Sequence, residues 1–185
     1  EWISYPVFYI DFGGKEYRAR KDLEEKLYSI LDNIKKEYNV TSSESSPELI
    51  FSDLIKSASE KYKKNVVVLV DEYDKALLET AGNKIENENC RSLLRAFLGV
   101  LKPCDSYLKF VFITGVTKFS KVSVFSDLNQ LNDISLSQAA QDLCGITQAE
   151  LEKYFKDEIG ILAQTNNISV NECLKSYLFS KYSLY

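Results

Sequence analysis

Two adjacent carboxylates at the end of an apolar run carry the strongest chemical signal in this sequence. Residues 66–70 are all valine or leucine, and Asp71 and Glu72 follow them directly. A short continuous apolar run predicts a β-strand buried on both faces, as in a parallel sheet. Open α/β sheets bind their ligands at the carboxyl ends of such strands. One acid there can hold Mg²⁺ while its neighbour orients an attacking water, so the pair indicates phosphoryl-transfer chemistry of the Walker B type.

A second strand ends in a polar residue at the corresponding place. Residues 108–113 are rich in aromatic and β-branched side chains, which predicts a strand, and Thr114 follows it. In P-loop ATPases with an additional strand, a polar residue at this place senses the γ-phosphate or its water. We therefore expect Thr114 to lie beside Asp71 and Glu72 on an adjacent parallel strand.

Helices must separate these strands if the sheet is parallel. Apolar residues recur at helical spacing over 21–38, and a second helix is expected from Pro47, after a capping Ser46, to about residues 61–64. A further helix carries residues 93–101 and stops before a proline. With a first strand at residues 7–10 that ends in a turn, the alternation predicts an α/β fold with helices on the faces of a parallel sheet.

The last part of the chain has helical signals only. Thr147 with Glu150, and Ser169 with Glu172, fit capping boxes, so two carboxyl-terminal helices are expected. The first of them would carry Leu151, Phe155, Ile159 and Leu162. We therefore divide the chain into an α/β core at 1–135 and a helical portion at 136–185.

A phosphate loop is missing from this sequence. The pattern G-x-x-x-x-G-K-[ST] does not occur, and the pair Gly13-Gly14 is followed by Lys15 and Glu16, which indicates a turn. The chain thus carries half of a nucleotide site.

Composition excludes several other classes of protein. The 185 residues, 45% hydrophobic and 27% charged, suit one globular domain, and the net charge of -4 gives no general attraction to nucleic acid. Histidine is absent and the four cysteines are dispersed, so a zinc site has no ligand set. No apolar stretch reaches the roughly 20 residues of a membrane span, and no signal peptide is evident, which favours a cytoplasmic location.

Three segments carry a family resemblance. Residues 68–77, 112–126 and 128–135, with flanking matches at 5–7 and 143–151, resemble the AAA-ATPase-like family of predicted bacterial P-loop ATPases. Members often continue into a PD-(D/E)XK nuclease-like domain. The resemblance implies a partial P-loop NTPase fold of the additional-strand type, in three layers and without its first strand, and a cofactor pair of ATP and Mg²⁺.

The same resemblance assigns residue roles. Asp71 would hold Mg²⁺, Glu72 would activate water and Thr114 would act as the sensor. Lys118 and Lys121 would contact phosphate or a partner, and a solvated basic loop is the alternative interpretation of these two lysines. The phosphate loop would lie upstream in a longer parent protein and the nuclease-like domain downstream. In such folds the phosphate-loop strand lies beside the sensor strand, so strand 108–113 would expose an apolar edge. We expect a segment of the parent, a second copy, or a helix from residues 136–185 to cover it.

Two other functions fit parts of the pattern. A degenerate module for protein interaction would keep the scaffold and lack the phosphate loop altogether. A magnesium-dependent nuclease could use Asp11, Asp71 and Glu72, although the sequence lacks the lysine of a D-(x)n-[DE]-x-K arrangement.

Overall fold

The chain forms two compact units, which are described separately. The units are Glu1–Leu131 and Asn132–Tyr185. The computed structural model describes residues 3–116, 124–125, 128, 130–135, 137–140, 143 and 145–175.

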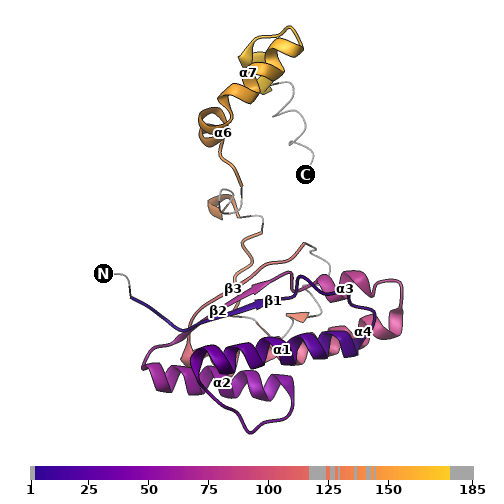
Figure 1. The fold of residues 1–185 in the computed structure, drawn as a ribbon, viewed down its shortest axis with the longest axis vertical. Helices are drawn as coiled ribbons and strands as arrows, with labels where there is room; N and C mark the ends of the chain where they lie inside the picture. The colour runs from indigo at the N-terminus through magenta and orange to yellow at the C-terminus, as the bar shows by residue number, and fades with distance from the viewer. Residues whose placement is uncertain are drawn as a thin grey trace. The chain divides into compact units, whose positions relative to one another are not determined.

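A three-stranded parallel sheet organises the first unit. Its strands are β1 (Val7–Asp11), β2 (Val66–Asp71) and β3 (Leu108–Ile113), in the order β1-β2-β3. Asp11 lies opposite Asp71 in the register of β1 and β2, and Val70 lies opposite Ile113 in that of β2 and β3. The α/β class and the three parallel strands expected from the sequence are confirmed, and the acid-bearing strand is the central one (Figure 1).

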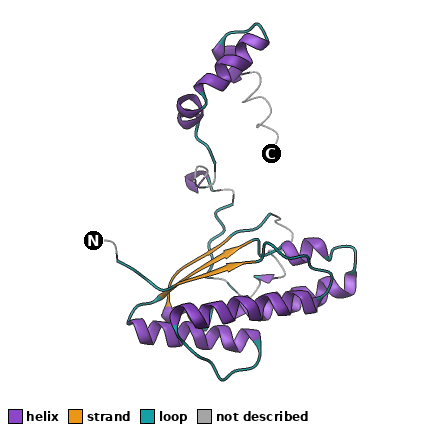
Figure 2. Ribbon diagram, in the orientation of Figure 1, coloured by secondary structure: helices purple, strands orange, loops and turns teal. Residues whose placement is uncertain are grey.

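Helices pack against one face of this sheet. They are α1 (Arg20–Tyr38), α2 (Pro47–Tyr62) and α4 (Lys84–Gly99), and a short helix, α3 (Lys75–Glu79), lies between β2 and α4 (Figure 2). A 3₁₀ turn, η1 (Asp105–Tyr107), leads into β3. The expected helices at 21–38 and from Pro47 are confirmed. Ser46 precedes α2 as expected, but its side chain makes no capping hydrogen bond.

The core of the first unit lies between the sheet and these helices. Strand residues that alternate along β1 and β2, among them Phe8, Ile10, Val68 and Val70, are at most 2% exposed. They meet the apolar faces of α1, α2 and α4 in one continuous cluster. The period of two along the strands and the helical period along the helices therefore bury their apolar sides against each other.

The opposite face of the sheet differs from the sequence-based expectation. Its residues are the alternate members of each strand, and the largest exposed fractions are 56% for Tyr9 and 55% for Phe110. Val67 and Leu69 on β2 are partly exposed. The prediction of a strand buried on both faces in a three-layer core is therefore wrong for the described residues of this unit, which form two layers. An apolar run shows that both faces of a strand can be buried. A face is buried only where another apolar layer packs against it.

The outer edge of β3 also lacks a strand partner among the described residues, where β3 pairs with β2 alone. The expectation that a segment of the parent, a second copy, or a helix from residues 136–185 covers this edge stays a prediction.

The second unit is helical. It contains a 3₁₀ turn, η2 (Gln138–Ala140), and the helices α6 (Gln148–Tyr154), α7 (Lys156–Thr165) and α8 (Val170–Cys173). Both predicted capping boxes are present, because the side chains of Thr147 and Ser169 accept the backbone N–H three residues later. The expectation of one helix that carries Leu151 to Leu162 is wrong, since the helix is interrupted at Phe155, between α6 and α7. The apolar spacing continues across this break and does not signal it.

The capping box of α6 makes a testable prediction about acidity. Backbone and side-chain hydrogen bonds from Thr147 hold the pKa of Glu150 below its usual value, because they favour the charged carboxylate. The Glu150 carboxylate thus stabilises the helix start above its unfolded pKa, and that contribution is lost as the pH falls through the folded pKa. Thr147→Ala should raise the pKa of Glu150 in a carboxyl NMR titration. The pKa of Glu172, which Ser169 caps separately, should stay where it is, and a shared shift would contradict this assignment.

None of the helices in the described part of the chain is both long and apolar enough to cross a membrane.

Candidate functional site

Asp71 and Thr114 meet at the carboxyl edge of the sheet. The Thr114 hydroxyl donates to Asp71 Oδ1 over 2.5 Å, and the Thr114 amide donates to the Val70 carbonyl over 2.8 Å. Parallel pairing of β2 and β3 brings the two residues to the same level, since Val70 is in register with Ile113. The expected adjacency of Asp71 and Thr114 is confirmed, while their chemical roles stay predictions.

Further donors hold the Asp71 carboxylate. The Glu72 amide donates to Oδ1 over 3.0 Å, and the Tyr9 hydroxyl lies 3.4 Å from Oδ2. Partial burial of Tyr9 and the charges of Asp11 and Asp71 raise the pKa of the Tyr9 phenol. The phenol therefore stays protonated and remains a donor to the acidic edge of the sheet.

Glu72 lies at a sharp turn of the backbone. Its φ of 52° is in the left-handed region, which non-glycine residues seldom occupy. Its carboxylate forms an ion pair with Lys75 over 3.3 Å, and about half of the side chain, 47%, is exposed. Residues held in such sparsely populated conformations cluster at functional sites. The turn directs Glu72 away from the course of β2 while keeping it next to Asp71 in the chain.

The end of β1 brings a third acid to this edge. Asp11 Oδ1 accepts the Gly13 amide over 2.6 Å. A β-carbon at Gly13 would lie 2.8 Å from Asp11 Oδ1 and 3.3 Å from Glu72 Oε2. Gly13 therefore permits a close approach of the β1 loop to Glu72. The glycine pair lies in the bend after β1, where the sequence placed a turn.

Hydrogen bonds join the segments that follow β2 and β3, next to this edge of the sheet. Asp74 is fully buried and its Oδ1 accepts the Val116 amide over 3.1 Å. The Tyr73 amide donates to the Thr114 carbonyl over 3.2 Å. These bonds tie residues 114–116 to residues 73–74.

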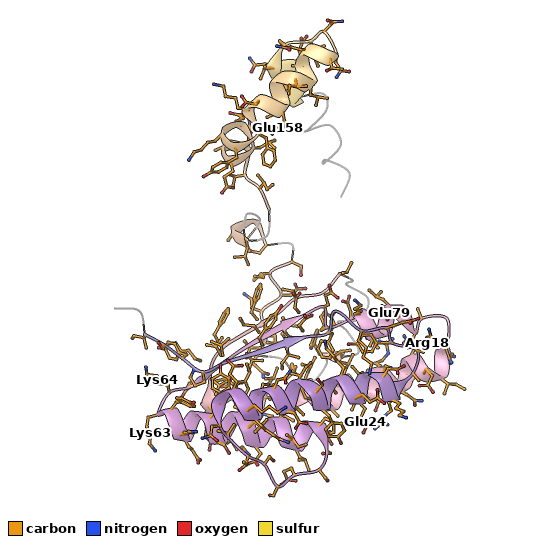
Figure 3. All side chains as sticks on the ribbon, viewed as in Figure 1. Arg18, Glu24, Lys63, Lys64, Glu79 and Glu158 are labelled. Atoms are coloured by element: carbon orange, nitrogen blue, oxygen red, sulfur yellow. The ribbon has the colours of Figure 1, made fainter. Side chains whose placement is uncertain are left out.

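Charged residues lie at both ends of the sheet in the first unit. Lys63 and Lys64 lie at the end of the sheet where β2 begins, and Glu79 and Arg18 lie at the opposite end, near the acidic edge (Figure 3). Glu79 accepts the Tyr17 amide over 2.6 Å, which fixes the loop that follows Gly13 and Gly14.

Magnesium fits the donor set at Asp71 in one specific way. In the described part of the chain, no three acidic or cysteine side chains are placed to hold a metal ion by themselves. Mg²⁺ is usually held by one or two carboxylates together with waters and substrate phosphates. Asp71, with the Thr114 hydroxyl beside it, is suited to that mode and unsuited to a site made of protein ligands alone.

The remaining sequence-based candidates are placed as follows. Lys118 and Lys121 lie outside the described residues. The acids of the nuclease alternative, Asp11, Asp71 and Glu72, share one edge of the sheet but do not form a metal-holding group among the described residues. The nuclease alternative therefore stays a prediction.

Comparisons with known proteins place the chain in a family. A family described as predicted AAA-ATPase matches residues 1–125. The chain belongs to the AAA-ATPase-like family. The match covers β1, β2 and β3, so it includes Asp71, Glu72 and Thr114 of this AAA-ATPase-like chain.

One curated relative extends the comparison. It is named "Uncharacterized protein in vnfD 5'region", from Azotobacter chroococcum mcd 1, and is 36% identical over 155 residues. The match covers 84% of the AAA-ATPase-like chain and 30% of the relative, so the chain spans under a third of that protein. No solved structure matches the chain.

Sequence reasoning gave Asp74 and Gly115 too little weight. Asp74 follows the acidic pair in the sequence, and the structure shows that its side chain is fully buried and makes no capping hydrogen bond to α3. A signal for Asp11 was present, because it follows an apolar run as Asp71 does. No sequence signal points to Gly115, since its role depends on the position of the Tyr73 ring.

Proposed function

We propose that this chain is part of an ATP-binding, magnesium-dependent ATPase domain. The hydrogen bond between Thr114 and Asp71, at the carboxyl edge of the central parallel strand, is the observation that carries the proposal. A single carboxylate beside a hydroxyl suits a metal ion that shares its coordination with phosphates. Membership of a family of predicted AAA-ATPases supports the same reaction class.

The proposal gives separate roles to Asp71, Glu72 and Thr114. Asp71 holds Mg²⁺, which when bound would neutralise charge on the phosphates. Glu72 accepts a proton from the attacking water, and Thr114 places its hydroxyl near the terminal phosphate or that water. Lys118 and Lys121 are proposed to contact phosphate.

The Lys75 ammonium has to release Glu72 for this step. Lys75 lies 3.3 Å from Glu72 Oε2 and 28% of its side chain is exposed. Ion pairs that are partly exposed to water contribute little, so the attacking water can compete with Lys75 for the Glu72 carboxylate.

The phosphate loop is proposed to lie in another part of the full-length protein. Triphosphate affinity in P-loop proteins comes largely from backbone N–H groups and the lysine of that loop. The motif is absent from these 185 residues. The strand that carries it would pair with the open edge of β3, next to Thr114, and would supply the missing half of the site. A nuclease-like domain after this chain is a further proposal from the family resemblance.

Calorimetric titration with Mg-ATP tests the division of the site. The full-length protein should bind Mg-ATP, and a chain of residues 1–185 should show no binding in the micromolar range, because the groups that hold the triphosphate are absent from it. Micromolar binding by residues 1–185 would contradict the proposal that the affinity comes from elsewhere. Absence of binding by the full-length protein would contradict the ATPase itself.

One observation favours a second candidate function, a non-catalytic interaction module. Tyr9 and Phe110 are 56% and 55% exposed on the sheet face opposite the helices, and exposed apolar patches mark interaction surfaces. The same titration separates the two functions, since an interaction module has no need to bind nucleotide in the full-length protein.

A further inference from the structure

Asp74 is an unusual residue in this structure because its carboxylate is fully removed from water. Among the described residues, Asp74 and Thr80 are the polar side chains classed as buried, with 0% and 2% exposure. Burying a carboxylate costs free energy unless hydrogen bonds compensate it. A side chain that only capped α3 could do so at the surface, so the burial of Asp74 calls for another explanation.

The Asp74 carboxylate holds the segment that follows β3. Its Oδ1 accepts the Val116 amide over 3.1 Å, across 42 positions of sequence. The neighbouring Tyr73 amide donates to the Thr114 carbonyl over 3.2 Å. Tyr73 and Asp74, which follow β2, thus bind Thr114 and Val116, which follow β3. Thr114 is held by these bonds through its backbone and by Asp71 through its hydroxyl.

Gly115 allows this contact to close. A β-carbon there would lie 2.4 Å from Tyr73 Cε1, 2.6 Å from Tyr73 Cδ1 and 2.8 Å from Asp74 Oδ1. Such distances are too short for real β-carbons, so either the Tyr73 ring or the 114–116 segment would have to move. The Tyr73 ring is 2% exposed and packs 4.8 Å from the Phe125 ring, which limits its freedom.

We propose that Asp74 is a positioning residue, which acts with Gly115 to hold residues 114–116 against the end of β2 and so keeps the Thr114 hydroxyl on Asp71. The inference rests on the proposed ATPase function for its catalytic consequence. Asp74 does not touch the nucleotide in this proposal. It acts through Thr114, whose distance from Asp71 depends on where the 114–116 segment lies.

The first test compares two buried polar residues in the full-length protein. Asp74→Ala should lower kcat by about 10- to 100-fold, the range seen when supporting hydrogen bonds around a metal site are removed, and leave KM for ATP unchanged. Asp74→Asn keeps an acceptor oxygen and should recover part of this loss. The matched control is Thr80→Val, which removes the hydroxyl bond to the Ala76 carbonyl and should lower stability without lowering kcat. All rates are measured well below the lowest melting temperature of the set.

The second test disturbs the contact without altering the carboxylate. Gly115→Ala should lower kcat as Asp74→Ala does, whereas Gly99→Ala, with nothing within 4 Å of the new β-carbon, should not. Amide hydrogen exchange on residues 1–185 without nucleotide gives an independent readout. Exchange at Val116 and Thr114 should accelerate in Asp74→Ala and stay slow in Thr80→Val.

The outcomes separate the two proposals. Unchanged kcat in Asp74→Ala, or unchanged exchange at Val116, would overturn the positioning role. A wild-type full-length protein that shows no turnover would overturn the proposed function, and the exchange measurement alone would then decide whether Asp74 holds the 114–116 segment.

Discussion

Glu72→Gln in the full-length protein is expected to reduce ATP turnover by about 10²- to 10⁴-fold, the usual contribution of a positioned general base. Glutamine has nearly the same shape but cannot take a proton from water. Binding of Mg-ATP should persist, because Asp71 and the phosphate loop are unaltered in the variant. Turnover measured at saturating Mg-ATP, together with a calorimetric dissociation constant, separates the loss of chemistry from a loss of binding.

The structure offers a suitable control for this substitution. Glu60→Gln changes an exposed acid on α2 and should leave turnover unchanged. It controls for the loss of one negative charge. Glu72→Gln also removes the ion pair with Lys75, so Lys75→Ala should be measured beside it. Turnover in Glu72→Gln equal to that of the wild type would remove Glu72 from its proposed role.

Phe97→Ala is expected to lower the free energy of unfolding of the chain by about 3–5 kcal/mol, the cost of truncating a buried aromatic residue. The Phe97 ring is fully buried on α4 and stacks on the Phe51 ring of α2, with 4.6 Å between ring centroids. Its removal leaves a cavity where two helices meet behind the sheet. The free energy of unfolding of a native protein is about 5–15 kcal/mol, so this one substitution removes a large part of the stability.

Urea denaturation of residues 1–185, followed by far-UV circular dichroism, measures this loss. The midpoint should fall while the slope of the free energy with urea stays constant. Leu49→Ala is the control, because Leu49 is on the same helix as Phe51 but is 50% exposed. A loss in Phe97→Ala no larger than that of Leu49→Ala would show that the stacked pair does not support the core.

The elements of the first unit follow from local patterns. The helical spacing over 21–38 predicts α1, and the Ser46-Pro47 start predicts α2. The apolar runs predict β1, β2 and β3, with Asp71 and Thr114 at strand ends. Each pattern reports a short-range preference that the tertiary structure did not override. The sequence does not predict the interruption of the helix at Phe155, because the apolar spacing continues through it.

Other features depend on contacts that a sequence pattern does not contain. A run such as residues 66–70 shows that both faces of β2 can be buried, but the burial of one face and the partial exposure of Val67 and Leu69 on the other depend on where the helices pack. The left-handed conformation of Glu72 is likewise imposed by the turn after β2, against the preference of a glutamate.

The sequence by itself determined the α/β class, the parallel strands and the presence of an acidic pair beside a threonine, because strand periodicity and strand-end chemistry are local properties. Only the tertiary structure decided that Asp74 is buried beneath that edge and that Gly115 must lack a side chain. The bond from Asp74 to Val116 joins residues 42 positions apart, and the space at Gly115 is set by the Tyr73 ring. Such contacts arise only when β2 and β3 lie side by side, because the pairing of these two strands brings the segments that follow them within hydrogen-bond distance.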